Sequence, residues 1–358
     1  MNMYRLGELN LAQYKGVRLI ITAVIKDVQV KQMKNGQDML NVTVVDKQAK
    51  RLVVWFGVSK ADTEKAQGLI GKVCDITVDV KPYAEGEDGV SLIIYDAYEN
   101  VNLPIDLFVP SVENINYYVD NMNNLLTMCK DTVFYDIAVR LLNKYWDTFS
   151  VVPAAKSNHH VLKGGLLMHS VSVALGCYNS YLVYTDIYGQ NFLNLPLLLC
   201  GALIHDIGKC FELDYDNLGG AVYSDTAYLE THIMRGLSEI DKVVTELDIM
   251  EDRDEILELK HMIASHHGKL EFGSPIKPSM PEAVILAAED EKDARMNCFS
   301  NKFAKLEPAT GDVTWGADGM TVYYKSAGPN GSPDDSPIGQ VVENVQETND
   351  NSSVGLVV

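Results

Sequence analysis

A long apolar run that ends in an adjacent histidine and aspartate constrains the fold of this chain more than any other stretch. Ten nearly unbroken apolar residues, Leu195–Ile204, lead directly into His205 and Asp206, and Gly208 and Lys209 follow. Such a run is too short to span a bilayer and is typical of a buried helix. A polar pair at the end of a buried helix needs a partner, because an unsatisfied polar group inside a protein is costly. A metal ion is the simplest partner, since imidazole and carboxylate are usual ligands of Mn, Fe, Zn and Co.

The histidines are concentrated around the same part of the chain. All eight lie in a window of less than a third of the sequence: His159, His160, His169, His205, His232, His261, His266 and His267. Histidines with ordinary core or surface roles would be scattered along the whole chain. Their clustering, together with acidic neighbours, favours a metal centre over a set of unrelated structural histidines.

The length and composition favour a two-domain globular protein. The 358 residues are enough for about two hydrophobic cores, and a hydrophobic fraction of 47% is ordinary. Met1–Lys15 lacks the apolar segment of a secretion signal, and no segment approaches the length of a transmembrane helix. The six cysteines form no C-x-x-C pair and are typical of reduced thiols. We therefore expect a cytoplasmic protein with no membrane partner.

The charge is unevenly distributed along the chain. Residues 1–100 contain 13 Lys and Arg against 13 Asp and Glu, so the remaining 258 residues carry the entire net charge of −19. This acidity argues against non-specific binding of nucleic acid by the whole surface. It leaves open a local binding groove, or a site where bound metal cations supply positive charge.

Residues 1–100 are predicted to form a small β domain. An Asn35-Gly36 hairpin signal stands between two β-rich runs, and a short helix is expected over 59–69. The expected strands cover residues 17–30, 39–45, 52–56, 76–80 and 90–95. Five strands with a helix between the third and the fourth resemble an OB-fold barrel.

Aromatic and basic residues of this β domain allow two interpretations. Trp55, Tyr83 and Tyr95 could stack on the bases of a single strand, with phosphates contacted by Lys31, Lys34, Lys50 and Arg51. Alternatively, the aromatic residues form the barrel core and the basic residues only keep the protein soluble. The first interpretation makes Trp55 a substrate-binding residue.

A linker is expected over residues 101–112, which contain Pro104 and Pro110, and an α-helical domain over 113–326. Its periodicity predicts helices over 113–129, 132–147, 166–184, 195–209, 229–246, 253–266 and 281–299. Val313–Lys325 is compatible with a short hairpin or a docking strand. The tail over 327–358 is rich in Gly, Pro, Ser, Asn and Asp and is predicted to be disordered. The fold class is thus multidomain α+β, with an all-β barrel followed by an all-α bundle.

The candidate metal ligands lie in the predicted helices or at their ends. In chain order they are His169, His205, Asp206, His232, His266, His267 and Asp290. Seven ligands are too many for one tetrahedral metal and suit two ions with open positions, and one carboxylate can bridge both ions. Two metals roughly 3.5–4 Å apart hold the attacking and leaving oxygens of phosphoryl transfer.

The order H…HD…H…HH…D resembles the signature of the HD superfamily of metal-dependent phosphohydrolases in its two-metal form. Further motifs resemble the YhaM-type 3′-to-5′ exoribonucleases, a family that also carries an N-terminal OB-fold. These motifs are Pro153–His160, Gly165–His169, His261–Lys269, Gly273–Pro275 and Asp290–Asn297. The resemblance covers roughly residues 1–325.

The resemblance implies a role for each ligand. His169, His205, Asp206 and Asp290 would hold one metal, and Asp206, His232, His266 and His267 the other, with Asp206 bridging. Two divalent ions are therefore the expected cofactors, with Mn²⁺ first and Co²⁺, Fe²⁺ or Mg²⁺ as alternatives.

Five residues near the motifs lie outside the ligand set and have other expected roles. Lys209 follows Asp206 by about one helical turn, so it would neutralise the scissile phosphate as a catalytic and substrate-binding residue. Alternatively it is a cation at a helix C-terminus, which the helix dipole favours. His160 would contact substrate or make a structural hydrogen bond. His159 and His261 are expected to support ligands or the structure, and Asp293 to orient a ligand or Lys209.

The expected activity is metal-dependent hydrolysis of single-stranded RNA from the 3′ end to 5′-mononucleotides. Single-stranded DNA is an additional candidate substrate, and a homo-oligomer is compatible with the sequence. One alternative is an HD phosphohydrolase that acts on free nucleotides, nucleotide second messengers or short oligonucleotides. Another is a non-catalytic protein that binds single-stranded nucleic acid, although the intact ligand set argues against a vestigial site.

Overall fold

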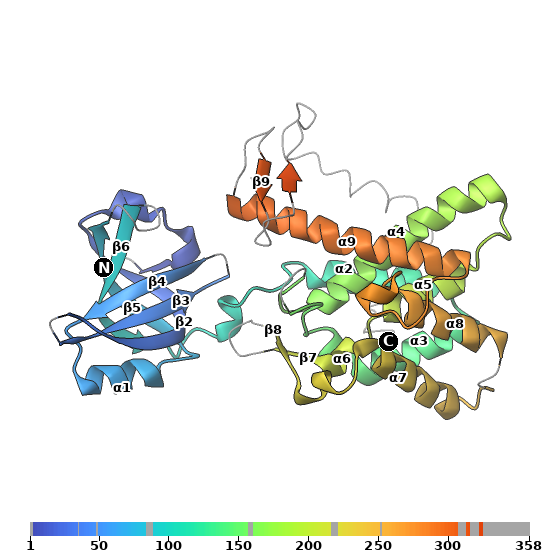
Figure 1. Cartoon of the computed structure of the whole chain (residues 1–358), viewed down its shortest axis with the longest axis horizontal. Helices are drawn as coiled ribbons and strands as arrows, with labels where there is room; N and C mark the ends of the chain where they lie inside the picture. Colours follow the sequence, from blue (N-terminus) through green and yellow to red (C-terminus); the bar gives the residue numbers. More distant parts are fainter. Residues whose placement is uncertain are drawn as a thin grey trace, which may run out of the picture. The chain divides into compact units, whose positions relative to one another are not determined.

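The computed structural model describes residues 3–34, 36–47, 49–83, 89–156, 160–215, 221–250, 253–306, 313–315 and 322–324 (Figure 1). The predicted disorder of the tail and the expected role of His159 fall outside these residues. The described chain forms two compact units that alternate along the sequence. Unit 1 comprises Met1–Tyr118, Tyr145–Met168 and Gly208–Arg235, and unit 2 comprises Val119–Lys144, His169–Ile207 and Gly236–Val358. The boundaries expected at residues 100 and 113 stay a prediction.

Five strands of unit 1 form the predicted barrel. They are β2 (Arg18–Gln32), β3 (Asp38–Val45), β4 (Lys50–Phe56), β5 (Val73–Pro82) and β6 (Val90–Glu99). The order β2-β3-β4-β6-β5 closes because β5 also pairs with β2, and β4 and β6 run parallel. Helix α1 (Lys60–Gly68) lies between β4 and β5 in the chain, as expected. The OB-like barrel is therefore confirmed.

The alternation of apolar and polar residues explains the barrel. In β5, Ile76, Val78 and Val80 are fully buried, and the residues between them are half-buried, as expected for strands with one face on a core. Ser59 begins α1 with a reciprocal capping box, in which its side chain accepts from the Asp62 backbone. A short strand, β1 (Met3–Arg5), pairs parallel with β2 and was not predicted, because three residues show no periodicity.

Trp55 belongs to the barrel core. Its side chain is only 8% exposed and lies in the same cluster of buried residues as Leu40 and Leu92. The prediction that Trp55 stacks on a nucleic-acid base is therefore wrong. In β4 alternate residues point inward, and a large indole gains most by burial. Tyr83 and Tyr95 are 50% and 63% exposed, so the core interpretation does not extend to them.

All seven helices expected after the linker are present, with their ends shifted by a few residues. They are α2 (Ile115–Thr127), α3 (Val133–Phe149), α4 (Gly165–Tyr188), α5 (Leu195–Ile204), α7 (His232–Glu246), α8 (Asp254–Ser265) and α9 (Pro281–Leu306). Helices α5, α8 and α9 of unit 2 pack against one another. All residues from Leu197 to Ile204 are buried, as the apolar run predicts.

The helix predicted over 195–209 is not continuous. Helix α5 ends at Ile204, His205–Gly208 form a turn, and the short helix α6 covers Lys209–Glu212. Strands β7 (Leu213–Tyr215) and β8 (Ala221–Tyr223) then pair antiparallel, a hairpin that was not predicted. His205 and Gly208 keep helical backbone angles within this turn, and the side chains of His205 and Asp206 both approach His169.

Helix α4 is long and apolar enough to cross a membrane by length and composition alone. The expectation that no segment approaches transmembrane length is therefore wrong for this helix. Its most apolar window is 44% buried inside the protein, and the helix carries the fully buried His169. The core helix of a protein that never enters a membrane meets the same test.

Two short strands follow α9. Strands β9 (Val313–Trp315) and β10 (Val322–Tyr324) pair antiparallel, with Thr314 opposite Tyr323. Of the two alternatives for this stretch, the hairpin is confirmed.

Candidate metal centre

Three histidines of the expected ligand set donate a hydrogen bond from Nδ1 to a main-chain carbonyl. The acceptors are Ala202 for His205, Ile263 for His266 and Phe272 for His267, at 2.7, 2.7 and 2.8 Å. His205 and His266 are the C-terminal caps of α5 and α8, where helix carbonyls have no partner within the helix. Because a carbonyl only accepts, each Nδ1 carries the proton and each Nε2 offers a lone pair.

The other two histidines are anchored by carboxylates. Nδ1 of His169 lies 2.7 Å from Oδ2 of Asp293, and Nδ1 of His232 lies 2.6 Å from Oε2 of Glu212. Glu212 also accepts from the backbone N–H of His232 at 2.8 Å, so it fixes both the ring and the start of α7. Histidines that bind metals usually donate their second N–H in this way.

The Nε2 atoms of His169 and His205 converge with two carboxylates in unit 2. They lie 3.3 Å from each other, and Nε2 of His169 is 3.2 Å from Oδ1 of Asp290. Both rings also approach Oδ2 of Asp206, at 3.4 Å from His169 and 3.3 Å from His205. The ligand atoms of His169, His205 and Asp290 lie within 4.8 Å of one another. Lone pairs that face lone pairs at these distances require a cation or a proton between them.

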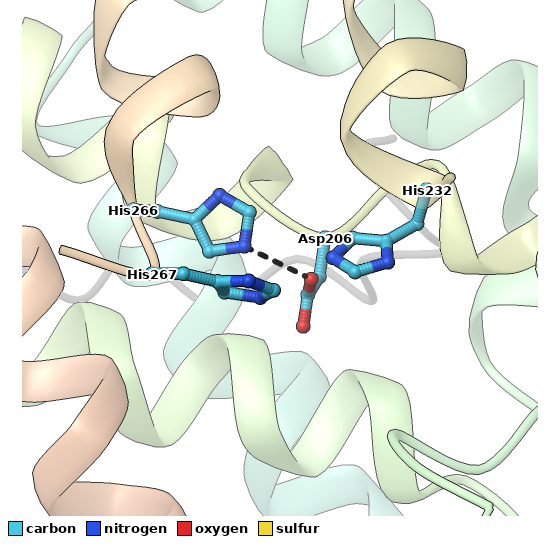
Figure 2. Close-up of side chains that lie close together, drawn as sticks. All are labelled: Asp206, His232, His266 and His267. Carbon is cyan, nitrogen blue, oxygen red and sulfur yellow. Dashed lines mark ion pairs between the residues drawn. The ribbon is translucent and has the colours of Figure 1, made fainter. Parts of the chain in front are cut away.

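A second group consists of Asp206, His232, His266 and His267. Figure 2 shows these side chains close together, and their ligand atoms lie within 4.8 Å of one another. Nε2 of His266 lies 3.5 Å from Oδ1 of Asp206, the interaction drawn as a dashed line in Figure 2. Asp206 thus turns Oδ2 toward His169 and His205 and Oδ1 toward His266. One carboxylate therefore lies between the two groups of histidines.

The electrostatics of the two groups differ. Burial alone would lower the pKa of His169, but hydrogen bonds with Asp206, Asp290 and Asp293 outweigh it and raise that pKa well above its ordinary value. Burial lowers the pKa of His266 and of His267, which keeps their rings neutral and able to coordinate. The donor set therefore fits divalent metal ions.

Lys209 lies directly after the turn that carries the His-Asp pair. Its side chain is buried. Burial would raise the pKa of Glu212, but the hydrogen bonds from His232 and, to a smaller extent, the charge of Lys209 outweigh it and lower that pKa. Because Lys209 begins α6, five residues beyond the end of α5, its interpretation as a C-terminal cation of the apolar helix is wrong. Its expected contact with the scissile phosphate stays a prediction.

The remaining predicted residues have different positions. Asp293 orients the ligand His169, one of its two expected roles. His261 accepts a 2.9 Å hydrogen bond from the Ser279 backbone, which is a structural contact. His160 is buried, has a φ of 46°, and offers a ring nitrogen within 4.8 Å of ligand atoms of His169 and Asp293. Its proposed contact with substrate stays a prediction.

Glu212 is a functional residue that the sequence did not single out. It precedes His232 by 20 residues, and the β7–β8 hairpin separates the two. An acidic residue at this separation has no periodic relation to the histidine, so no sequence pattern identifies it.

An OB-like barrel together with a helical region that carries this ligand set defines an HD-domain protein. The model of the HD domain family matches residues 159–295. Two relatives, both called 3′-5′ exoribonuclease YhaM, are similar over most of the chain. The relative from Bacillus velezensis is 32% identical, over 76% of this chain and 84% of its own length. The relative from Bacillus subtilis is 34% identical, over 59% of this chain and 63% of its own length. Among solved structures, RecG bound to a three-way DNA junction matches at 18% identity and a TM-score of 0.24, over 40% of this chain and 19% of that chain.

The chain belongs to the YhaM family.

Proposed function

We propose that this protein is a metal-dependent 3′-5′ exoribonuclease that hydrolyses single-stranded RNA to 5′-mononucleotides. The observation that carries the proposal is the anchored donor set. Five histidines donate from Nδ1 to an oxygen, and the Nε2 atoms of three of them, His169, His205 and His266, lie within 3.5 Å of Asp206. Membership of the YhaM family supports the same reaction and direction. A protein that only binds nucleic acid would have no need for this arrangement.

The proposed cofactors are two divalent ions, with Mn²⁺ first. His169, His205 and Asp290 would hold one ion, and His232, His266 and His267 the other, with Asp206 shared. Imidazole and carboxylate together suit Mn²⁺ and Fe²⁺. Two such metal ions, when bound, would activate water and neutralise charge on a phosphodiester.

The chain's own residues prepare this centre. Asp293 and Glu212 hold the Nδ1 protons of His169 and His232, which keeps each Nε2 lone pair directed at the ligand group. Lys209 is proposed to neutralise the scissile phosphate from the start of α6, which follows the turn that carries Asp206. The buried walls of α5 exclude water around His205 and Asp206, which strengthens electrostatic interactions there.

A groove on the barrel is the proposed contact for the rest of the strand. It has a volume of about 630 Å³ and lies over β4 and β6. Phe56, Leu52 and Tyr83 line it and are 45%, 57% and 50% exposed. Arg51 and Lys81 line the same groove. Exposed rings beside basic side chains can stack on bases and contact phosphates without reading sequence.

The test is a nuclease assay on a single-stranded RNA labelled at its 5′ end. With Mn²⁺ we expect a ladder that shortens from the 3′ end and releases 5′-mononucleotides, and EDTA should abolish it. Parallel reactions use Mg²⁺, single-stranded DNA of the same sequence, and a dinucleotide. Hydrolysis of the dinucleotide with no shortening of the long RNA would contradict the proposal and favour a phosphohydrolase of short oligonucleotides.

Two narrower statements belong to the proposal. Single-stranded DNA is a second substrate, since phosphate contacts and base stacking do not require a 2′-hydroxyl. The protein acts in the cytoplasm and not at a membrane. Fractionation of cells that express the tagged chain checks the location, and light scattering checks for the homo-oligomer that the sequence allows.

A further inference from the structure

A small pocket of unit 1 lies beside one of the candidate metal ligands. It has a volume of about 150 Å³, and its lining includes Phe211, Glu212, Thr226, Glu230, His232 and Arg235. His232, which lines this pocket, is also a member of the second ligand group.

The walls of the pocket are held in place by contacts within unit 1. The guanidinium of Arg235 lies 4.1 Å from the centroid of the Phe211 ring, and the edge of that ring meets Tyr145 at 5.0 Å between centroids. Nη1 of Arg235 lies 3.6 Å from Oε2 of Glu230, so the arginine also orients that carboxylate. The two side chains are about one-third exposed, and solvent reaches them.

The volume restricts what the pocket can hold. A cavity of about 150 Å³ accommodates one six-membered ring such as benzene. A sugar ring fits this space, whereas a complete nucleoside does not. The ribose of an internal nucleotide, which is followed by a further phosphate and nucleotide, would not fit either. The pocket therefore suits the terminal ribose of a nucleic-acid strand.

The charge decides between a phosphate and a neutral sugar. Two of the lining side chains, Glu212 and Glu230, are carboxylates, and one, Arg235, is a cation. Within the pocket this excess of carboxylate disfavours a phosphate group. Carboxylates do accept hydrogen bonds from the hydroxyls of a ribose, as in dinucleotide-binding sites.

We propose that this pocket receives the ribose of the 3′-terminal nucleotide and that Glu230 accepts hydrogen bonds from its 2′- and 3′-hydroxyls. Thr226 and Arg235 complete the polar rim, and the base projects out of the pocket. The site would give a preference for ribose over deoxyribose and would require a free 3′ end. The inference rests on the proposed exoribonuclease function and makes Glu230 its specificity-determining residue.

The experiment uses the full chain with Mn²⁺ and RNA oligomers that differ only in the last nucleotide. The four ends are ribose, 2′-deoxyribose, 3′-deoxyribose and a ribose 3′-phosphate. In single turnovers we expect the wild type to remove the ribose end about 10- to 100-fold faster than either deoxy end, since a hydrogen bond to a charged acceptor contributes that much. The 3′-phosphate end should be slowest, because it adds both bulk and charge.

Replacement of Glu230 should remove the preference. For Glu230→Ala we expect slower removal of the ribose end and a ribose-to-deoxyribose ratio below about threefold, with Glu230→Gln in between because its amide oxygen still accepts. The control is Glu255→Ala, since Glu255 also pairs with an arginine, Arg253 at 2.8 Å, and does not line the pocket. The control should keep the wild-type ratio, and melting temperatures check the fold of all three variants.

A binding measurement separates this inference from the proposed function. Calorimetry should find that the wild type binds adenosine 5′-monophosphate more tightly than its 2′-deoxy analogue, and that Glu230→Ala binds both alike. Equal wild-type rates on ribose and deoxy ends, or an unchanged ratio in Glu230→Ala, would overturn the terminal-ribose pocket. If the wild type shortens none of the oligomers, the proposed function is contradicted. The ratio of the affinities for adenosine 5′-monophosphate and its 2′-deoxy analogue then tests the pocket by itself.

Discussion

Asp206 is the residue that the two ligand groups share. Its Oδ2 lies 3.3–3.4 Å from the imidazoles of His169 and His205, and its Oδ1 lies 3.5 Å from that of His266. The side chain is almost fully buried, and in the proposed function it would be a ligand of both metal ions.

The substitution Asp206→Asn should separate charge from packing at this position. The amide has nearly the same volume, so α5 should pack as before, but a neutral side chain bridges two cations poorly. We expect loss of at least one metal ion per chain and a decrease of about 100-fold or more in RNA hydrolysis, with an unchanged circular dichroism spectrum. Elemental analysis of protein purified without chelator measures the metal. Lys209→Ala is the comparison and should keep its metals while losing part of the rate, whereas an Asp206→Asn protein with two metals and most of its activity would contradict the assignment.

The sequence predicted which histidines and aspartates gather, but it identified only one of the two carboxylates that orient them. The expected histidines and aspartates do gather, because residue types with metal chemistry and an unusual distribution leave a signal along the chain. Asp293 was also recognised, since it follows Asp290 by three residues on one helix. Glu212 was not, because its relation to His232 arises only when the β7–β8 hairpin folds.

At the scale of elements, the glycine at the start of α4 allows that helix to lie close to the backbone at Ala154 and His160. Gly165 is the first residue of α4, and a Cβ built there would meet the carbonyl oxygen of His160 at 2.0 Å and the backbone nitrogen of Ala154 at 3.1 Å. Those two backbone groups are themselves hydrogen-bonded at 3.2 Å. Neither neighbour is a flexible side chain, so the backbone must move to make room.

Gly165→Ala should therefore destabilise the protein. We expect the free energy of unfolding to fall by about 1–3 kcal/mol or more, because overpacking against backbone cannot be relieved by a change of rotamer. The measurement is a urea unfolding curve at fixed metal concentration. The matched control is Gly68→Ala at the end of α1, where nothing lies within 4 Å of the new methyl group. Equal stability of Gly165→Ala and the wild type would show that the junction is less tightly packed than its geometry indicates.

Element boundaries show where periodicity is informative and where it is not. The apolar run over α5 predicted a buried helix correctly, yet it could not show that the helix ends at Ile204. The turn after it depends on tertiary contacts of His205 and Asp206, which a pattern of hydrophobicity does not contain. In the same way, alternation predicted β4, but only the closed barrel determines that Trp55 faces inward.

At the scale of the whole molecule, the proposed function assigns binding of the RNA strand to the barrel and its hydrolysis to the metal centre. The five barrel strands and the seven helices were predicted from the sequence, since each is long enough to show its period. The grouping of the chain into units did not, because the two units alternate along it and depend on contacts between distant segments. Surface charge adds a reason for the division, as residues 1–100 are neutral while the remainder carries −19. A polyanion meets less repulsion at the barrel than at the rest of the surface.

The double substitution Arg51→Ala with Lys81→Ala tests this division. Both residues line the barrel groove, and if each contacts one phosphate, the slope of log affinity against log salt should weaken by about 1.4 for a single strand. Binding of a long RNA should fall at low salt, while the rate on a saturating dinucleotide stays within about twofold of the wild type, because the metal ligands are untouched. Fluorescence anisotropy at several salt concentrations gives the slope. The control pair, Lys60→Ala with Lys72→Ala, removes two barrel cations that pair with Glu64 and Glu99 outside the groove and should leave the slope unchanged. A parallel loss on the long RNA and the dinucleotide would mean that the groove supports the centre itself, and the barrel would then not be a separate binding element.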